Sequence, residues 1–179
     1  MSSNIDLVIF GARGDLAKRK LLPALYQLDK AGLLPDSTRV AAVARENIDT
    51  VEFIKHTSEL FKGLYGEDNW DEKVWSRFSR RLHYIKVDFS QKKEFSGLKQ
   101  WIVDKRTMIY YLATPPSLFG SICKHLDDAG CVTPTSRIVL EKPIGHDLQS
   151  SEQVNGAVGQ YFDEGNIYRI DHYLGKETV

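Results

Sequence analysis

The predicted fold rests on the stretch Ile5-Asp-Leu-Val-Ile-Phe10 and on the turn Gly11-Ala-Arg-Gly-Asp-Leu-Ala17 that follows it. The first six residues are mostly apolar and branched, which predicts a buried β-strand that Gly11 closes. The pattern then becomes helical from Asp15 to about Lys30. Pro23 lies inside this segment, so we expect a kink or two helical pieces there. A strand, a glycine turn and a helix in this order begin an α/β fold.

The same alternation continues along the whole chain. Further strands are expected at residues 39–44, 83–88, 108–113, 137–140 and 166–170. Helices are expected between them, at about residues 50–62, 70–81, 90–104 and 147–162, with one more that follows Pro116 and ends at Ala129. Strands that alternate with helices predict a Rossmann-like, doubly wound and mostly parallel sheet with helices on both faces. A length of 179 residues fits a single domain over residues 1–179.

The composition excludes several classes of function. Lysine plus arginine equals aspartate plus glutamate, 24 against 24, so no overall charge favours a nucleic acid or an anionic membrane as partner. Cys123 and Cys131 supply neither a disulfide framework nor a four-ligand metal set, and no metal is expected. The apolar runs are strand-sized, and the opening residues MSSNID do not resemble a signal peptide. We therefore expect a cytoplasmic protein.

Functional residue types follow the expected strands, at the edge where open α/β sheets bind ligands. Gly11 permits a sharp turn, and Gly14 lets the main chain approach a pyrophosphate, whose charge the amides at the helix start can accept. A glycine turn that only starts a helix is the alternative. Arg45 follows the second strand and suits the 2′-phosphate of NADP, whereas the adjacent Glu46 leaves NAD open. Arg13 would add a second positive charge near that phosphate.

Two later segments carry further polar groups. Glu141-Lys-Pro-Ile-Gly145 places Lys142 at the end of the fifth strand, either as an electrostatic clamp or proton-handling group, or as an ordinary solvated lysine. Arg169-Ile-Asp-His-Tyr-Leu-Gly-Lys176 follows the last strand, and three of its side chains together suit a phosphate monoester: His172, Tyr173 and Lys176. On chemistry alone, the histidine could instead be a general base that Asp171 orients.

Together, GARGDLAKRK, EKPIG and RIDHYLGKE resemble, in order and spacing, the amino-terminal part of the glucose-6-phosphate dehydrogenase family. The family oxidises C1 of glucose 6-phosphate to 6-phosphogluconolactone and reduces NADP to NADPH, in the oxidative pentose phosphate pathway. The resemblance implies coenzyme contacts from Gly11, Ala12, Arg13, Gly14, Asp15, Leu16, Ala17, Lys18, Arg45, Asp88, Thr114, Pro115, Pro116 and Lys142. It implies substrate contacts from Lys20, Lys142, His172, Tyr173 and Lys176. Arg13 departs from the family, which often has a small or hydroxyl residue there.

The resemblance also implies a second domain that these residues do not include. In the family, the catalytic base is a different histidine in a larger domain resembling an antiparallel sheet with helices, and Asp171 would orient that base. We therefore expect this chain alone to bind NADP weakly without turnover, and the full-length protein to be a homo-oligomer. Two alternatives are a non-catalytic NADP-binding module and a relative of glucose–fructose oxidoreductase and inositol dehydrogenase. Those enzymes also carry Glu-Lys-Pro after a comparable strand, but they act on unphosphorylated polyols.

Overall fold

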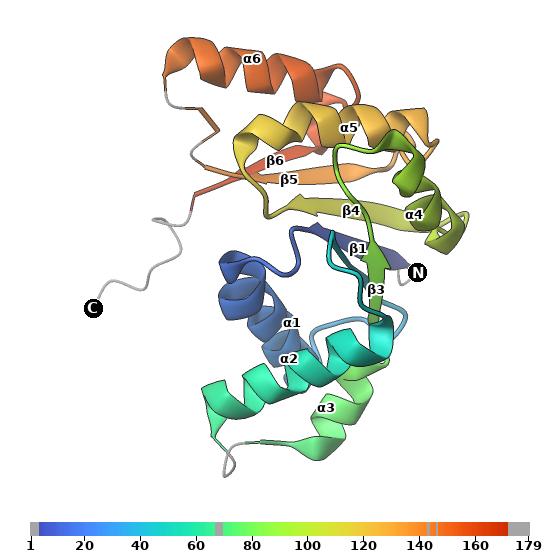
Figure 1. The fold of residues 1–179 in the computed structure, drawn as a ribbon, viewed down its shortest axis with the longest axis vertical. Helices are drawn as coiled ribbons and strands as arrows, with labels where there is room; N and C mark the ends of the chain where they lie inside the picture. Colours follow the sequence, from blue (N-terminus) through green and yellow to red (C-terminus); the bar gives the residue numbers. More distant parts are fainter. Residues whose placement is uncertain (1–3, 67–69, 143, 146, 172–179) are drawn as a thin grey trace.

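A single parallel sheet forms the centre of the molecule. The computed structural model describes residues 4–66, 70–142, 144–145 and 147–171. Within these ranges six strands lie in the order β3-β2-β1-β4-β5-β6 (Figure 1). Their bounds are β1 (Ile5–Phe10), β2 (Arg39–Ala44), β3 (Leu82–Lys86), β4 (Thr107–Leu112), β5 (Arg137–Glu141) and β6 (Ile167–Ile170). All the pairings are parallel, and the strand order reverses between β1 and β4, which confirms the predicted doubly wound sheet.

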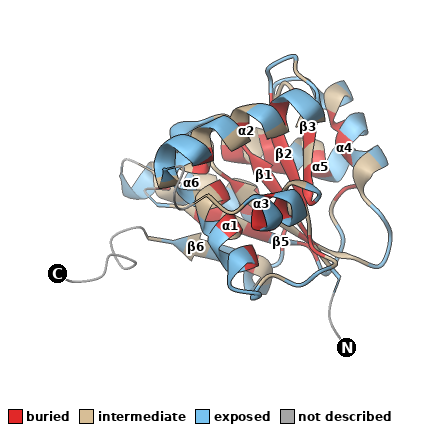
Figure 2. Ribbon diagram, turned by 90° about the horizontal axis from the view of Figure 1, so that it is seen from below, coloured by how far each residue is buried: buried red, intermediate tan, exposed pale blue. Residues whose placement is uncertain are grey.

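Helices cover the two faces of the sheet as separate groups (Figures 1 and 2). One group contains α1 (Leu22–Lys30), α2 (Thr50–Tyr65) and α3 (Glu72–Ser79), and the other contains α4 (Phe95–Trp101), α5 (Phe119–Asp128) and α6 (Leu148–Gly159). The described residues also form three 3₁₀ turns: η3 (Lys92–Glu94), η4 (Pro116–Leu118) and η5 (Glu164–Asn166). Side chains of β1 alternate between the two cores, since Val8 and Phe10 join one cluster and Ile9 joins the other.

The helix after the glycine turn has two parts, as Pro23 predicts. Its first part is a π-helical turn, η1 (Ala17–Leu21), in which the amide of Leu22 donates to the carbonyl of Ala17. A proline has no amide hydrogen and crowds the carbonyl four residues earlier, so a regular α-helical turn is unfavourable immediately before Pro23. The wider π turn accommodates the proline, and the helix then continues as α1.

A buried carboxylate joins β1 to its two neighbouring strands. Asp6 is fully buried and accepts hydrogen bonds from Arg39, the first residue of β2, and from Arg106, which precedes β4 and lies at 2.7 Å through Nε. The guanidinium of Arg39 also lies over the ring of Trp101, 4.2 Å from its centroid. A charge this deep requires close partners, and Asp6 has two of them. The three strands are therefore tied together where they begin.

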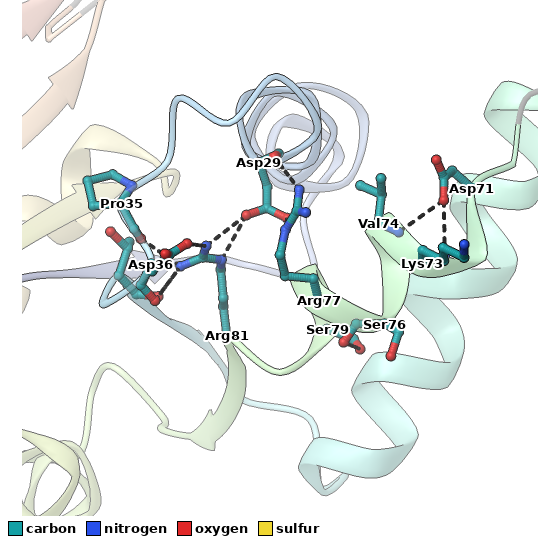
Figure 3. A network of polar contacts seen from close by, with 11 residues as sticks. Asp29, Pro35, Asp36, Asp71, Lys73, Val74, Ser76, Arg77, Ser79 and Arg81 are labelled. Carbon is teal, nitrogen blue, oxygen red and sulfur yellow. Dashed lines mark hydrogen bonds and ion pairs between the residues drawn. The ribbon is translucent and has the colours of Figure 1, made fainter.

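A second buried carboxylate, Asp29, joins α1 to α3 and to the start of β3 (Figure 3). Arg77 donates from Nε to this carboxylate at 2.8 Å, and Arg81 donates from Nε at 3.0 Å. Arg81 also donates to three carbonyls of the loop before β2, those of Pro35, Asp36 and Thr38, at 2.7, 3.0 and 3.1 Å. Because Arg81 directly precedes β3, this network also lies at the edge where the strands begin.

The aromatic residues predicted for the core are in the core. Phe53, Phe61, Trp75 and Phe78 are buried, and Trp70 packs against the same cluster. No helix within the described ranges is long and apolar enough to cross a membrane.

Candidate functional site

A groove of about 560 Å³ lies at the opposite edge, where β1, β2, β3 and β4 end. Residues at or shortly after the ends of these four strands line it: Gly11, Arg13 and Gly14; Ala44, Arg45 and Glu46; Asp88, Phe89 and Ser90; and Ala113, Thr114, Pro115 and Leu118. Parallel strands present their carboxyl ends at one edge, so segments far apart in the sequence meet there. The groove spans the point where the strand order reverses, which is where open α/β sheets bind ligands.

The glycine turn forms part of this groove through close main-chain contacts. Gly11 has a φ of +79°, and a Cβ placed there would lie 2.4 Å from the carbonyl oxygen of Ala113. The amides of Gly11 and Ala12 donate to the carbonyl of Val43 at 3.0 and 3.2 Å, and the amide of Gly14 donates to Gly11 at 2.9 Å. The turn therefore requires glycine at position 11. The amides of Gly11, Ala12 and Gly14 are already used, so an anion would meet other amides of the turn and of the helix start.

The rest of the predicted coenzyme segment runs away from the turn into the helix. Asp15 is exposed, and its Oδ1 lies 3.7 Å from Nε of Arg19. Leu16 is half-buried, and Ala17 is fully buried. Lys18 is half-buried and lines a second, smaller cavity, whereas Lys20 is exposed on η1. The structure thus brings only part of the predicted set to the groove.

Arg13 makes a contact that the sequence did not predict. Its Nη1 lies 3.2 Å from Nδ1 of His56 on α2, and its Nε is buried without a hydrogen-bond partner among the described residues. An isolated histidine inside a helix carries no spacing that marks it as part of a site. The contact becomes visible only when α2 is placed beside the turn.

The second and third strands contribute charges of both signs. Asp88 accepts from the hydroxyl of Ser90 at 2.7 Å and from its amide at 2.9 Å. These hydrogen bonds, helped by the positive charge of Arg45, lower the pKa of Asp88 below its ordinary value. The main-chain oxygen of Glu46 accepts from the hydroxyl of Tyr84 at 2.8 Å. Burial raises the pKa of Tyr84 to about 12, so the phenol stays protonated and can hold this loop.

The Thr114-Pro-Pro116 segment lies partly in the groove. Thr114 and Pro115 line the groove, whereas Pro116 begins η4 and is not among the lining residues. The hydroxyl of Thr114 is buried and has no hydrogen-bond partner within the described ranges.

The segments after β5 and β6 lie on the same edge, beyond the groove. Lys142 is exposed, and its amide donates to the carbonyl of Ile170 at 2.9 Å, immediately before Asp171. Tyr111 donates its hydroxyl to the carboxylate of Glu141. Burial, followed by this carboxylate, raises the pKa of Tyr111. The three residues predicted to hold a phosphate monoester, His172, Tyr173 and Lys176, lie outside the described residues.

The described part of the chain holds no group of three or more histidine, cysteine or acidic side chains suited to a metal ion. Cys123 and Cys131 are buried thiols, and burial raises their pKa values to about 12 and about 11. Both stay protonated at neutral pH, so neither is a ready nucleophile or metal ligand.

A family model described as the NAD binding domain of glucose-6-phosphate dehydrogenase matches residues 8–179. The chain belongs to the glucose-6-phosphate dehydrogenase family. Glucose-6-phosphate 1-dehydrogenase of Dickeya dadantii is 46% identical over 175 residues, which is 97% of this chain and 35% of that protein. The Gluconobacter oxydans protein of the same name is 43% identical over 178 residues, 97% of this chain and 36% of that protein. The chain thus spans about a third of the length of these curated relatives.

Solved structures of the family share the fold. The glucose-6-phosphate 1-dehydrogenase of Mycobacterium avium superposes with a TM-score of 0.88 at 35% identity, covering 97% of this chain and 37% of that one. A glucose-6-phosphate dehydrogenase in complex with its substrate glucose-6-phosphate gives a TM-score of 0.86 at 32% identity, and the match covers 98% of this chain and 38% of that one. These likenesses, with the family model, identify the chain as a dinucleotide-binding domain of this family, and the groove lies where such domains bind their ligand.

Proposed function

We propose that residues 1–179 are the NADP-binding domain of a glucose-6-phosphate 1-dehydrogenase. In the reaction, hydride leaves C1 of glucose 6-phosphate for NADP, which gives 6-phosphogluconolactone and NADPH. The observation that carries the proposal is the groove at the strand-order reversal, where the glycine turn and Arg45 meet in a chain of this family. Bound NADP supplies the hydride acceptor, and the residues of this chain hold and orient it.

The groove residues fit a phosphorylated dinucleotide. The main-chain turn at Gly11 leaves no side chain between the ligand and the ends of β1 and β4. The helix begins at Asp15, Leu16 and Ala17, and in this proposal their amides receive the pyrophosphate. Arg45 is exposed beside the groove and offers paired donors to a 2′-phosphate.

The arginine at the end of β2, Arg45, supports the choice of NADP over NAD. Two guanidinium groups, those of Arg13 and Arg45, line it together with the carboxylates of Glu46 and Asp88. Asp88 already accepts two hydrogen bonds from Ser90. Glu46, the acidic residue next to Arg45, is the group that would instead favour NAD.

The outer half of the edge would bind the sugar. We assign the phosphate of glucose 6-phosphate to His172, Tyr173 and Lys176, with Lys20 nearby. Lys142 would contact both coenzyme and sugar, because it follows β5 beside the end of β4. Asp171 would orient a catalytic base supplied by a second domain. A positioned general base typically increases the rate of the chemical step on the order of 10²–10⁴-fold. We therefore expect no turnover by the 179-residue chain, and we expect it to bind NADP weakly. In the full-length protein we expect a homo-oligomer.

The coenzyme assignment is tested by thermal unfolding of the purified chain with NADP⁺ and with NAD⁺. A ligand at about 100 times its dissociation constant stabilises the folded state by about 2.7 kcal/mol. We expect a larger rise in Tm with NADP⁺ than with NAD⁺, and loss of that difference in Arg45→Ser. The matched control is Arg80→Ser, which removes an exposed arginine far from the groove. No stabilisation of the wild-type chain by either dinucleotide would refute the assignment.

The prediction about turnover has its own assay. NADPH formation from glucose 6-phosphate is followed at high protein concentration, where a slow reaction would still be visible. Sustained turnover by the purified chain would contradict the need for a base from a second domain and would point to His172 as the base.

A further inference from the structure

One wall of the groove is a loop rather than a strand or a helix. The β3 loop, residues 88–91, lies between β3 and η3, and three of its residues line the groove: Asp88, Phe89 and Ser90. Ser90 donates two hydrogen bonds to the carboxylate of Asp88, and the amide of Gln91 donates to the carbonyl of Asp88 at 2.9 Å. These contacts shape the loop internally and do not attach it to another element.

A histidine on α5 attaches the loop to a helix. Nδ1 of His125 lies 3.0 Å from the carbonyl oxygen of Phe89. A carbonyl oxygen has no hydrogen to donate, so Nδ1 carries the proton and is the donor. The histidine ring is half-buried and meets the ring of Phe95 edge-on, with 5.3 Å between the centroids. The imidazole is therefore held between the β3 loop and the first residue of α4.

Two other contacts act near the same place. The ring of Phe89 packs edge-on against the ring of Phe10, with 5.5 Å between centroids, which restrains the side chain of Phe89. Lys92 in η3 lies 3.2 Å from the carboxylate of Asp128 on α5, but 60% of the Lys92 side chain is exposed. Exposed ion pairs contribute little because water screens them. The half-buried hydrogen bond from His125 is thus the stronger of these two polar ties to α5.

The place of the loop in the sheet decides which part of a ligand it meets. In the proposed complex the 2′-phosphate of NADP meets Arg45, which follows β2, and β3 is the next strand in the sheet. Adenine is bonded to the same ribose that carries the 2′-phosphate, so the β3 loop is the wall beside the adenosine half of the coenzyme. If the loop leaves this position, the apparent dissociation constant rises in inverse proportion to the fraction of molecules that keep it there.

We propose that His125 is a positioning residue for the binding of adenine nucleotides. By donating to the main chain of Phe89, it holds the β3 loop at the groove, and it is not itself among the described residues that line the groove. This role rests on the proposed NADP function and adds a residue that no motif marks. Because the loop lies beside the adenosine half, His125 should affect NADP and NAD alike, whereas Arg45 should affect their affinity ratio.

Calorimetric titration of the purified chain with NADP⁺, NAD⁺ and 5′-AMP tests this role. His125→Leu removes the donor and keeps an apolar side chain against Phe95. All three ligands should bind about fivefold more weakly, which corresponds to the loss of one hydrogen bond of about 1 kcal/mol, and the NADP⁺ to NAD⁺ ratio should not change. His125→Asn should restore most of the affinity, because its amide nitrogen is bonded to Cγ as Nδ1 of histidine is.

The matched control is His83→Leu on β3. Nδ1 of His83 lies 3.2 Å from the carbonyl oxygen of Arg81, and its ring packs against Trp101 with 5.7 Å between centroids. His83 therefore makes the same kinds of contact as His125, but at the edge where the strands begin. Urea unfolding gives the stability of each variant. We expect comparable losses of stability from the two leucine substitutions, and a loss of affinity from His125→Leu alone.

The outcomes separate this role from the proposed function. Wild-type affinity in folded His125→Leu, equal losses of affinity in His125→Leu and His83→Leu, or no recovery in His125→Asn would overturn the role of His125 and leave the NADP function standing. If His125→Leu does not fold, His125→Gln takes its place, since its amide lies one carbon farther from the main chain and should show the same loss. A wild-type chain that binds none of the three ligands would overturn both.

Discussion

Replacing Gly11 by alanine perturbs the most crowded backbone position of the groove. The residue has a φ of +79°, where side chains other than glycine are strained. An alanine Cβ would also lie 2.4 Å from the carbonyl oxygen and 3.0 Å from the carbonyl carbon of Ala113, and 3.1 Å from Cγ2 of Thr114. The nearest of these atoms belongs to the main chain at the end of β4, so the clash cannot be relieved by rotating a side chain.

The expected loss of stability is the sum of two costs. A left-handed conformation costs a non-glycine residue about 1–2 kcal/mol. Overpacking a close contact costs a further ~1–3 kcal/mol. Together, Gly11→Ala should lower the free energy of unfolding by about 2–5 kcal/mol, which is a large fraction of the roughly 5–15 kcal/mol typical of a folded domain.

Urea denaturation followed by circular dichroism measures this loss. The control is Gly63→Ala within α2, where an added Cβ meets nothing within 4 Å. That variant should be as stable as the wild type, or more stable by up to ~1 kcal/mol, because alanine favours a helix over glycine. A Gly11→Ala free energy within about 0.5 kcal/mol of the wild type would refute the reasoning, since that is the range of neutral surface substitutions.

Three other substitutions test the ionic and capping contacts. Asp29→Asn should destabilise the fold by about 3–5 kcal/mol in urea denaturation, because Arg81 would remain buried without a balancing charge. Asp147→Ala should cost about 1 kcal/mol in the same assay, since it removes the side chain that caps the first turn of α6. Asp128→Asn tests pH dependence. The hydrogen bond from Lys124 is the main cause that lowers the pKa of the Asp128 carboxyl below its ordinary value of 3.8. The ionised carboxylate therefore stabilises the folded state above that pH, and this stabilisation is lost as the pH falls further. The Tm difference from wild type should therefore shrink below about pH 4.

The first two of these substitutions each have a matched control. Asp36→Asn removes a fully exposed carboxylate 3.7 Å from Arg81 and should cost less than about 1 kcal/mol. Asp147→Asn keeps a good capping side chain and should restore most of the loss. Equal effects of Asp29→Asn and Asp36→Asn, or a Tm difference for Asp128→Asn that is constant from pH 2.5 to 7, would contradict these predictions.

The sequence predicted the sheet, and it predicted that residues at the ends of the strands lie together, because both follow from local patterns. Short apolar runs separated by amphipathic ones determine a parallel sheet, and parallel strands must end at one edge. Arg45, Asp88 and Thr114 could therefore be assigned to a common site without knowledge of any contact between them. Pro23 likewise predicted a kink or two helical pieces, and the structure has two pieces.

The remaining contacts depend on packing that no local pattern specifies. His56 meets Arg13 across 43 residues, and Arg106 meets Asp6 across 100. Neither pair has a motif, because each is created by the placement of a helix or strand beside another. Pro116 itself is not among the residues that line the groove, whereas Leu118, two residues later in η4, is.

The two buried carboxylates lie at the opposite edge of the sheet from the groove. Asp6 and Asp29, with their arginines, hold the chain where the strands begin, while the groove is formed where the strands end. The charges that resist unfolding and the charges that select a ligand are therefore carried by different residues at different ends of the molecule. An engineer could exchange groove side chains to alter coenzyme choice while the anchoring charges stay in place.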